Sequence, residues 1–90
     1  MADIRVNSEG LYEFGKNLLG MAGSLSNSYS KLKAQTQSVN ESWKDRQNAE
    51  FMDKFLSDTE IIYKVSDKIA EYGNFILRQA ARLQEYESGR

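Results

Sequence analysis

Apolar residues recur at alternating intervals of three and four along almost the whole chain, in two long runs. This spacing averages 3.5 residues and keeps one apolar stripe along a helix, as in bundles and coiled coils. The 90 residues include no proline, so no position is barred from a helix. The sequence therefore predicts an all-α protein with two long helices. The first run, of apolar and small residues, is Leu11, Phe14, Leu18, Met21, Leu25, Ser28 or Tyr29, Leu32, Gln35 or Thr36, and Val39. The second is Phe51 or Met52, Phe55, Asp58 or Thr59, Ile62, Val65, Ile69, Tyr72, Ile76, Ala80, Leu83 and Tyr86.

A polar segment, Asn40 to Asn48, separates the two runs. Asn40 and Asp45 within it are of the types that cap helices, and Asn7 stands before the first run in the same role. We expect a single domain over residues 1–90, with a first helix at about 8–40, a turn at 41–46 and a second helix at about 47–87. Helices joined by so short a turn fold back antiparallel, as a helical hairpin.

Four glycines lie in the first run, at Gly10, Gly15, Gly20 and Gly23. In a helix interior each costs about 1 kcal/mol relative to alanine. One interpretation is a marginal helix that breaks near residues 20–24. The other is that these small residues allow another backbone to come close, and the sequence leaves both open.

The two stripes are wider than one helix can cover on the other, and a small two-helix core rarely supplies enough stability. We therefore predict that two hairpins pair into a four-helix bundle, as a homodimer or as a heterodimer with a related hairpin. The residues that we expect along the dimer seam are the larger apolar members of both runs. They are Phe14, Leu18, Leu25, Leu32, Ile62, Val65, Ile69 and Ile76.

The residues for most enzyme chemistry are missing. The chain has no histidine and no cysteine, which excludes serine–histidine and cysteine–histidine nucleophiles and most zinc sites. Carboxylates four apart, such as Glu41 with Asp45, are better explained as solvated charge, and no glycine-rich phosphate loop follows a strand. We predict that the protein is not an enzyme and binds no cofactor or metal.

The charge is balanced, with five basic and five acidic side chains in residues 1–45 and seven and eight in residues 46–90. Without a basic face, binding to nucleic acid is disfavoured. The N-terminal residues lack the features of a secretory signal peptide, and no apolar run is long enough for stable membrane insertion. We expect the protein either in the cytoplasm or exported by a route that needs no signal peptide.

Trp43, the one tryptophan, lies in the polar segment. It is either a hydrophobic plug that pins the turn to the end of the bundle or an exposed anchor in a partner-binding patch. Both roles are compatible if the turn packs across a dimer interface.

The layout resembles the WXG family of small helical hairpins, the substrates of type VII (ESX) secretion. The resemblance covers nearly the whole chain and rests on the lead-in Ile4-Arg5-Val6, the turn approach Val39 to Trp43, and the aromatic residues Phe51 and Phe55. The third motif position is Asp45, where the family has glycine. Aspartate there can adopt a left-handed conformation or act as a helix N-cap.

Family members also carry export signals near the C-terminus, and Leu83 with Glu87 resembles the opening of one such spacing. The resemblance implies a secreted effector or carrier that acts by dimerisation and protein–protein binding, with the secretion machinery or a larger cargo protein as a further partner. Two alternatives from other classes remain: a cytoplasmic adaptor or targeting chaperone for a larger secreted toxin, and a structural subunit of a secretion filament.

Overall fold

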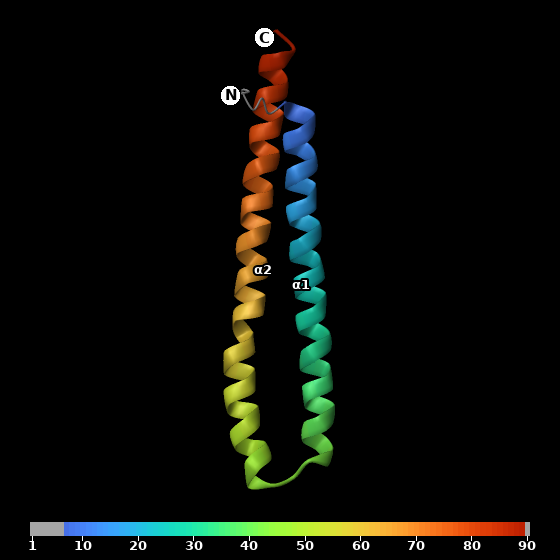
Figure 1. Ribbon diagram of the computed structural model, residues 1–90, viewed down its shortest axis with the longest axis vertical. Helices are drawn as coiled ribbons and strands as arrows, with labels where there is room; N and C mark the ends of the chain where they lie inside the picture. Colours follow the sequence, from blue (N-terminus) through green and yellow to red (C-terminus); the bar gives the residue numbers. More distant parts are fainter. Residues whose placement is uncertain (1–6, 90) are drawn as a thin grey trace, which may run out of the picture.

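The chain folds into two long antiparallel helices joined by a short turn, as the sequence predicts (Figure 1). The computed structural model describes residues 7–89. Helix α1 spans Ser8–Ser42 and α2 spans Arg46–Glu87. The result is an extended rod of 67 × 26 × 14 Å with the start of α1 and the end of α2 at the same tip (Figure 1). The lead-in Ile4-Arg5-Val6 lies outside the described residues.

Side-chain caps define the starts of both helices. The Asn7 side chain accepts a hydrogen bond from the Gly10 backbone N–H at 2.7 Å, and Asp45 accepts one from the Asn48 N–H at 2.9 Å. Asn40 was expected to close the first helix, but α1 runs two residues further and Trp43 is its C-cap. The connection between the helices is correspondingly shorter than the expected 41–46.

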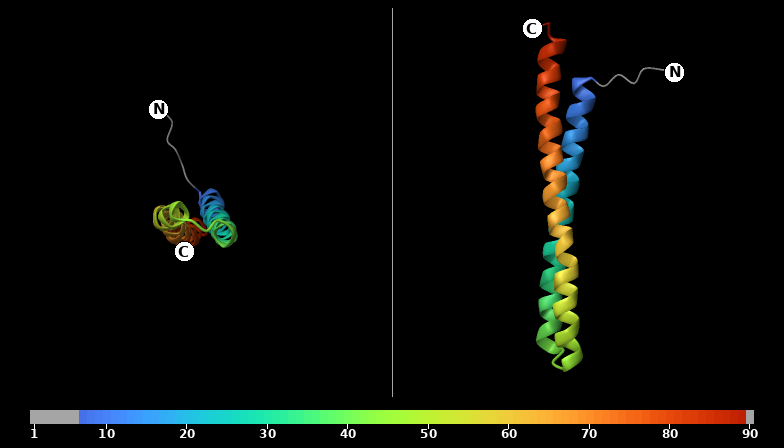
Figure 2. Two further views of the ribbon diagram at one scale, coloured as in Figure 1. Left: turned by 90° about the horizontal axis from the view of Figure 1, so that it is seen from below. Right: turned by 90° about the vertical axis from the view of Figure 1, so that its left-hand side faces the viewer.

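The helices wind around each other, so that in the side view α1 crosses from one side of α2 to the other (Figure 2). Apart from Asn48, the buried residues of each helix lie seven or fourteen positions apart, which is the repeat that keeps one face turned toward the partner. This inner row consists mostly of small or polar residues, which lets the two helices lie close together. It contains Gly15, Ala22 and Thr36 in α1, and Met52, Ser66, Gly73 and Ala80 in α2.

The two helices come close together at Gly15 and Gly73. A Cβ built on either glycine would lie 3.2 Å from the carbonyl oxygen of the other. Leu77 covers Gly15 and Leu19 covers Gly73, each with a side-chain carbon within 3.0 Å of that Cβ position. Of the two interpretations of the glycines, close approach therefore holds at Gly15, whereas α1 continues unbroken through residues 20–24.

A second link joins the helices at the tip that holds the chain ends. The backbone N–H and the hydroxyl of Ser8 donate to the two carboxylate oxygens of Glu87, at 3.0 Å and 2.6 Å. Glu87 is the last residue of α2 and Ser8 the first of α1, so this carboxylate also neutralises the positive end of the α1 dipole. The hairpin is thus tied at both ends.

Candidate partner-binding face

One broad side of the hairpin is apolar along its whole length. Because the inner rows keep a strict interval of seven, residues three positions further along each helix form a second row that stays on one side of the rod. In both helices this second row is almost entirely large and apolar. We call this side the apolar face; its central rows are Leu11, Leu18, Leu25, Leu32 and Val39 in α1, and Phe55, Ile62, Ile69, Ile76 and Leu83 in α2.

Shared surface hollows show that the two rows lie on the same side. Leu32 and Val39 of α1 line one hollow together with Phe55 of α2, near the turn. Leu11 lines another with Leu83, near the chain ends. The rows therefore run side by side, and the apolar face spans both helices.

An outer row widens the apolar face. Its members lie four residues before a residue of the central rows, or three residues after Leu83 in the case of Tyr86, and are exposed in the single hairpin. They are Phe14 and Met21 in α1, and Phe51, Val65, Tyr72 and Tyr86 in α2. An exposed apolar surface of this extent is typical of a protein-binding site.

Trp43 and two phenylalanines build an aromatic cluster at the turn end of this face. The ring centroids of Trp43 and Phe51 are 5.8 Å apart, and those of Phe51 and Phe55 are 5.0 Å apart in a stacked arrangement. The cluster lines an open hollow of about 300 Å³ with Met52 and residues of α1. Trp43 is half-buried, so its indole packs at the turn and also contributes to the surface of the apolar face.

Asp45 acts through its cap and not through an unusual backbone conformation. Its φ of −134° and ψ of 179° are extended, and no non-glycine residue among 7–89 has a positive φ. A side-chain oxygen on the α2 N–H groups is the ordinary role of aspartate at this position. Aspartate at the position where the WXG family has glycine was expected to be either left-handed or an N-cap, and in the structure Asp45 is the N-cap of α2.

The two candidate export residues, Leu83 and Glu87, lie at the other end of the rod. Leu83 is half-buried on the apolar face beside Leu11, in a hollow that Tyr86 also lines. Glu87 is engaged by Ser8. The structure thus places Leu83 in a row available to a partner, whereas the Glu87 carboxylate already joins the two helix ends.

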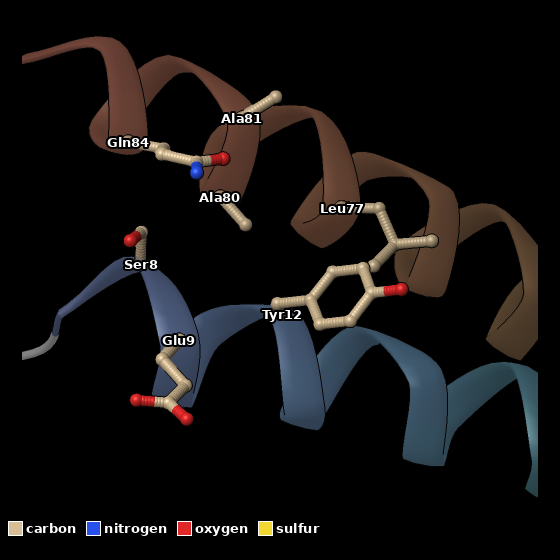
Figure 3. A pocket seen from close by; sticks show the side chains of 7 residues that line it. All are labelled: Ser8, Glu9, Tyr12, Leu77, Ala80, Ala81 and Gln84. Atoms are coloured by element: carbon tan, nitrogen blue, oxygen red, sulfur yellow. The ribbon is translucent and has the colours of Figure 1, made fainter.

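The opposite side of the hairpin has fewer large apolar residues. A hollow of about 410 Å³ near the chain ends is lined by Tyr12, Leu77 and Ala80, among others (Figure 3). Tyr12 lies toward Leu77 across the gap between the helices, and the Lys16 ammonium stands 5.0 Å from the centre of its ring. Lys33 lies over the Tyr29 ring in the same way. This side of the hairpin therefore combines aromatic rings with positive charge.

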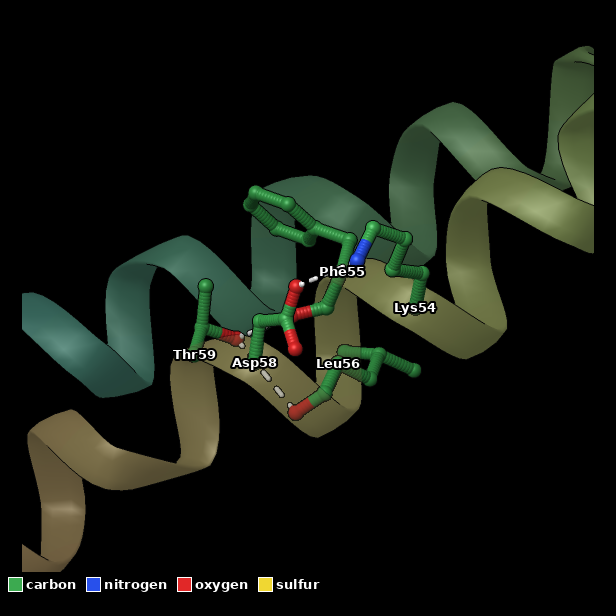
Figure 4. A network of polar contacts seen from close by, with 5 residues as sticks. All are labelled: Lys54, Phe55, Leu56, Asp58 and Thr59. Carbon is green, nitrogen blue, oxygen red and sulfur yellow. Dashed lines mark hydrogen bonds and ion pairs between the residues drawn. The ribbon is translucent and has the colours of Figure 1, made fainter.

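One charged pair borders the apolar face. Lys54 and Asp58 form an ion pair of 3.3 Å (Figure 4). Beside it, the hydroxyl of Thr59 donates to the Phe55 carbonyl at 2.7 Å, which satisfies this polar group within its own helix (Figure 4). The charge of Asp58 is therefore balanced locally, where it interrupts the outer row between Phe51 and Val65, while the central row continues from Phe55 to Ile62.

A buried amide lies behind the turn. Asn48 is 5% exposed, its amide nitrogen donates to the Asn40 side chain at 2.7 Å, and its Oδ1 has no partner. The link ties the last turns of α1 to the first turn of α2. This is the role of Asn40, which sequence reasoning had assigned to helix capping.

The eight predicted seam residues all lie on the apolar face. Phe14 and Val65 are exposed, and the other six are half-buried. None belongs to the inner row. The inner row instead consists mostly of small residues. The sequence analysis placed Ala80 in the second run and allowed a close approach at Gly15, but it missed Ala22, Ser66 and Gly73. The signal for them was a repeat of seven among residues of low hydrophobicity, Gly15 and Ala22 in α1 and Ser66, Gly73 and Ala80 in α2.

The described residues contain neither a metal-binding cluster nor a helix that could span a membrane. Over residues 7–89, no group of three acidic side chains is arranged to hold a metal ion. In the same part of the chain, neither helix has a stretch apolar and long enough to cross a membrane.

These features define a two-helix hairpin that exposes one apolar face. Solved structures of the secreted protein EsxB from Bacillus anthracis str. Sterne have this fold. The match to the structure of one EsxB variant covers 100% of this chain and 99% of the EsxB chain, with a TM-score of 0.83 and 18% sequence identity. The match to a structure of wild-type EsxB covers 93% of this chain and 97% of the EsxB chain, with a TM-score of 0.80 and 19% sequence identity. No family model matches the chain, and no curated protein matches it.

Proposed function

We propose that this protein is a WXG-type hairpin of type VII (ESX) secretion, which pairs through its apolar face into a four-helix bundle and is exported by that system. The observation that carries the proposal is the apolar face itself. It follows both helices from Leu11 and Leu83 at one tip to Val39 and Phe55 at the other. Association with a surface of the same length and shape removes all of it from water.

The fold likeness to secreted EsxB supports export. So does the arrangement at the turn, where Trp43 packs with Phe51, since both residues carry the resemblance to the WXG family. Asp45 keeps the start of α2 without the family glycine. The protein acts by binding other proteins and not by catalysis.

Export is tested by following the protein in culture medium. Antibody detection is compared between the native host and a strain that lacks the type VII export ATPase, with a cytoplasmic protein as the lysis control. The proposal predicts the protein in the medium of the parent strain and its retention in the cells of the ATPase mutant. Equal amounts in both media, or none in either, contradict the export part of the proposal.

A further inference from the structure

A second exposed apolar strip lies on α2, beside the apolar face but turned away from α1. Ile61 and Phe75 are 61% and 48% exposed, and they are fourteen residues apart, which is two heptads on the same line of the helix. Val65 and Tyr72 border them on the side of the apolar face. We call the strip formed by Ile61 and Phe75 the α2 edge; Val65 and Tyr72 belong to the outer row of the apolar face. The α2 edge extends for about 21 Å along the rod.

Pairing through the apolar face leaves Ile61 and Phe75 uncovered. Their line is displaced from the central row of α2 by about 100° around the helix, so they point past the side of a partner that sits on that face. The hollow beside Tyr72, Phe75 and Arg78 opens along the same line. The exposure of these two residues therefore needs an explanation other than the dimer.

Positive charge surrounds the α2 edge. Lys64, Lys68, Arg78 and Arg82 occupy the positions beside and along it. Three acidic residues also border it: Glu71 pairs with Lys68 at 3.7 Å, Asp58 pairs with Lys54 at 3.3 Å, and Glu85 follows Arg82. The remaining positive charge opposes a second copy of the same strip, because like charges would meet. It favours a partner that carries acidic residues.

We infer that the α2 edge is a docking site for an acidic amphipathic helix of another protein, separate from the apolar face. Rows of side chains spaced by three and four along a straight helix match the rows of a second helix laid beside it. A helix can also present a carboxylate to Lys68, which interrupts the strip midway between Ile61 and Phe75. A flat lipid surface would have to cover the Lys68–Glu71 ion pair instead.

The test uses a labelled synthetic peptide that forms an amphipathic helix with leucines on one side and glutamates along its flanks. A second peptide has lysines in place of the glutamates, and vesicles of phosphatidylcholine with phosphatidylserine serve as the lipid probe. We expect binding of the glutamate peptide, weakening as salt is raised, and no comparable binding of the lysine peptide. The double variant Ile61→Gln, Phe75→Gln should weaken binding by roughly tenfold or more.

Leu56→Gln is the matched control, since Leu56 is exposed on the side of the hairpin away from the apolar face. It should bind the glutamate peptide as the unchanged protein does. Circular dichroism and sedimentation should give the same helix content and mass for all three proteins, which separates this inference from the proposed pairing. The inference is overturned by equal binding of both peptides, by equal binding to the double variant, or by binding to the vesicles alone.

Discussion

Gly15 of α1 and Gly73 of α2 face each other with no room for a side chain between them, since a Cβ on either would lie 3.2 Å from the other's carbonyl oxygen. The two helices can therefore approach closely at the end of the rod that holds the chain termini. Leu19 and Leu77 pack over the two glycines, and most of the other large apolar residues are left on one side of the pair. The apolar face is in this way a consequence of a hairpin interior built from small residues.

Gly15→Ala should lower the free energy of unfolding by about 1 kcal/mol, because Leu77 and the Gly73 backbone must move to accept the methyl group. Gly20→Ala is the matched control. Nothing lies within 4 Å of the Cβ position at Gly20, so this change should raise the free energy by about 0.5–1 kcal/mol through helix propensity. Urea unfolding followed by circular dichroism measures both. An equal gain from the two substitutions would show that the helices are not in contact at Gly15.

Asp45→Ala should cost about 1 kcal/mol of unfolding free energy, because it removes the acceptor for the Asn48 N–H. Asp45→Gly should cost only a few tenths of a kcal/mol, since glycine is tolerated at an N-cap. Asp45→Asn should be close to neutral for the same reason. The order of the three variants in urea unfolding is the readout, and a stabilising glycine would mean that backbone conformation, not capping, matters at this position.

Asn40→Ala should destabilise the protein by about 1–2 kcal/mol, because it leaves the buried amide nitrogen of Asn48 without its acceptor. Asn48→Leu removes both buried polar atoms, including the Oδ1 that has no partner, and continues the central apolar row of α2. It should therefore be neutral or stabilising by up to about 1 kcal/mol. Thermal unfolding of the two variants distinguishes them, and a large loss from Asn48→Leu would indicate that the amide has a partner in the assembled protein.

Trp43→Ala should cost about 2 kcal/mol of unfolding free energy, since it removes a half-buried indole that packs on Phe51. Trp43→Phe keeps an aromatic ring against Phe51 and should cost less than about 1 kcal/mol. Urea unfolding of both variants at the same protein concentration measures these changes in the free energy of unfolding. A loss from the alanine variant within about 0.5 kcal/mol would assign Trp43 to partner contacts alone.

Much of the architecture follows from local patterns in the sequence. The alternating spacing of leucine, isoleucine and aromatic residues predicted both helices, because it persists for many turns without proline. The starts of α1 and α2 followed from the capping chemistry of Asn7 and Asp45. The end of α1 was less well placed, because Asn40 is a good cap by type but is used instead as a partner for Asn48.

The interior of the hairpin was not predictable in the same way. A search for apolar periodicity gives little weight to Gly15, Ser66 or Gly73, although small size is what fits them for a close helix pair. The bond between Ser8 and Glu87 joins residues 79 positions apart, and no local pattern indicates which ends will meet. The sequence analysis assigned Glu87 to a possible export signal. Only the structure shows that its carboxylate accepts hydrogen bonds from Ser8 and joins the ends of the two helices.

The central claim is that the apolar face is covered by a partner hairpin. Phe14 and Tyr12 allow a matched test, because they are 51% and 48% exposed and lie on opposite sides of the same helical turn. Phe14→Asp places a charge on the apolar face, and Tyr12→Asp places the same charge on the other side. Neither is in the interior of the hairpin, so both variants should retain their helix content.

The decisive measurement is the mass of the purified protein and these two variants by sedimentation equilibrium. The account predicts twice the 10.3 kDa of one chain for the unchanged protein and for Tyr12→Asp, and a shift toward the single-chain mass for Phe14→Asp because a charge in an apolar interface is heavily penalised. If the partner is a related hairpin, the complex with that hairpin should have the two-chain mass for the unchanged protein and for Tyr12→Asp. The complex of Phe14→Asp should shift toward the masses of the separate chains. A stable, folded single chain at high concentration that also ignores the related hairpin would contradict the account.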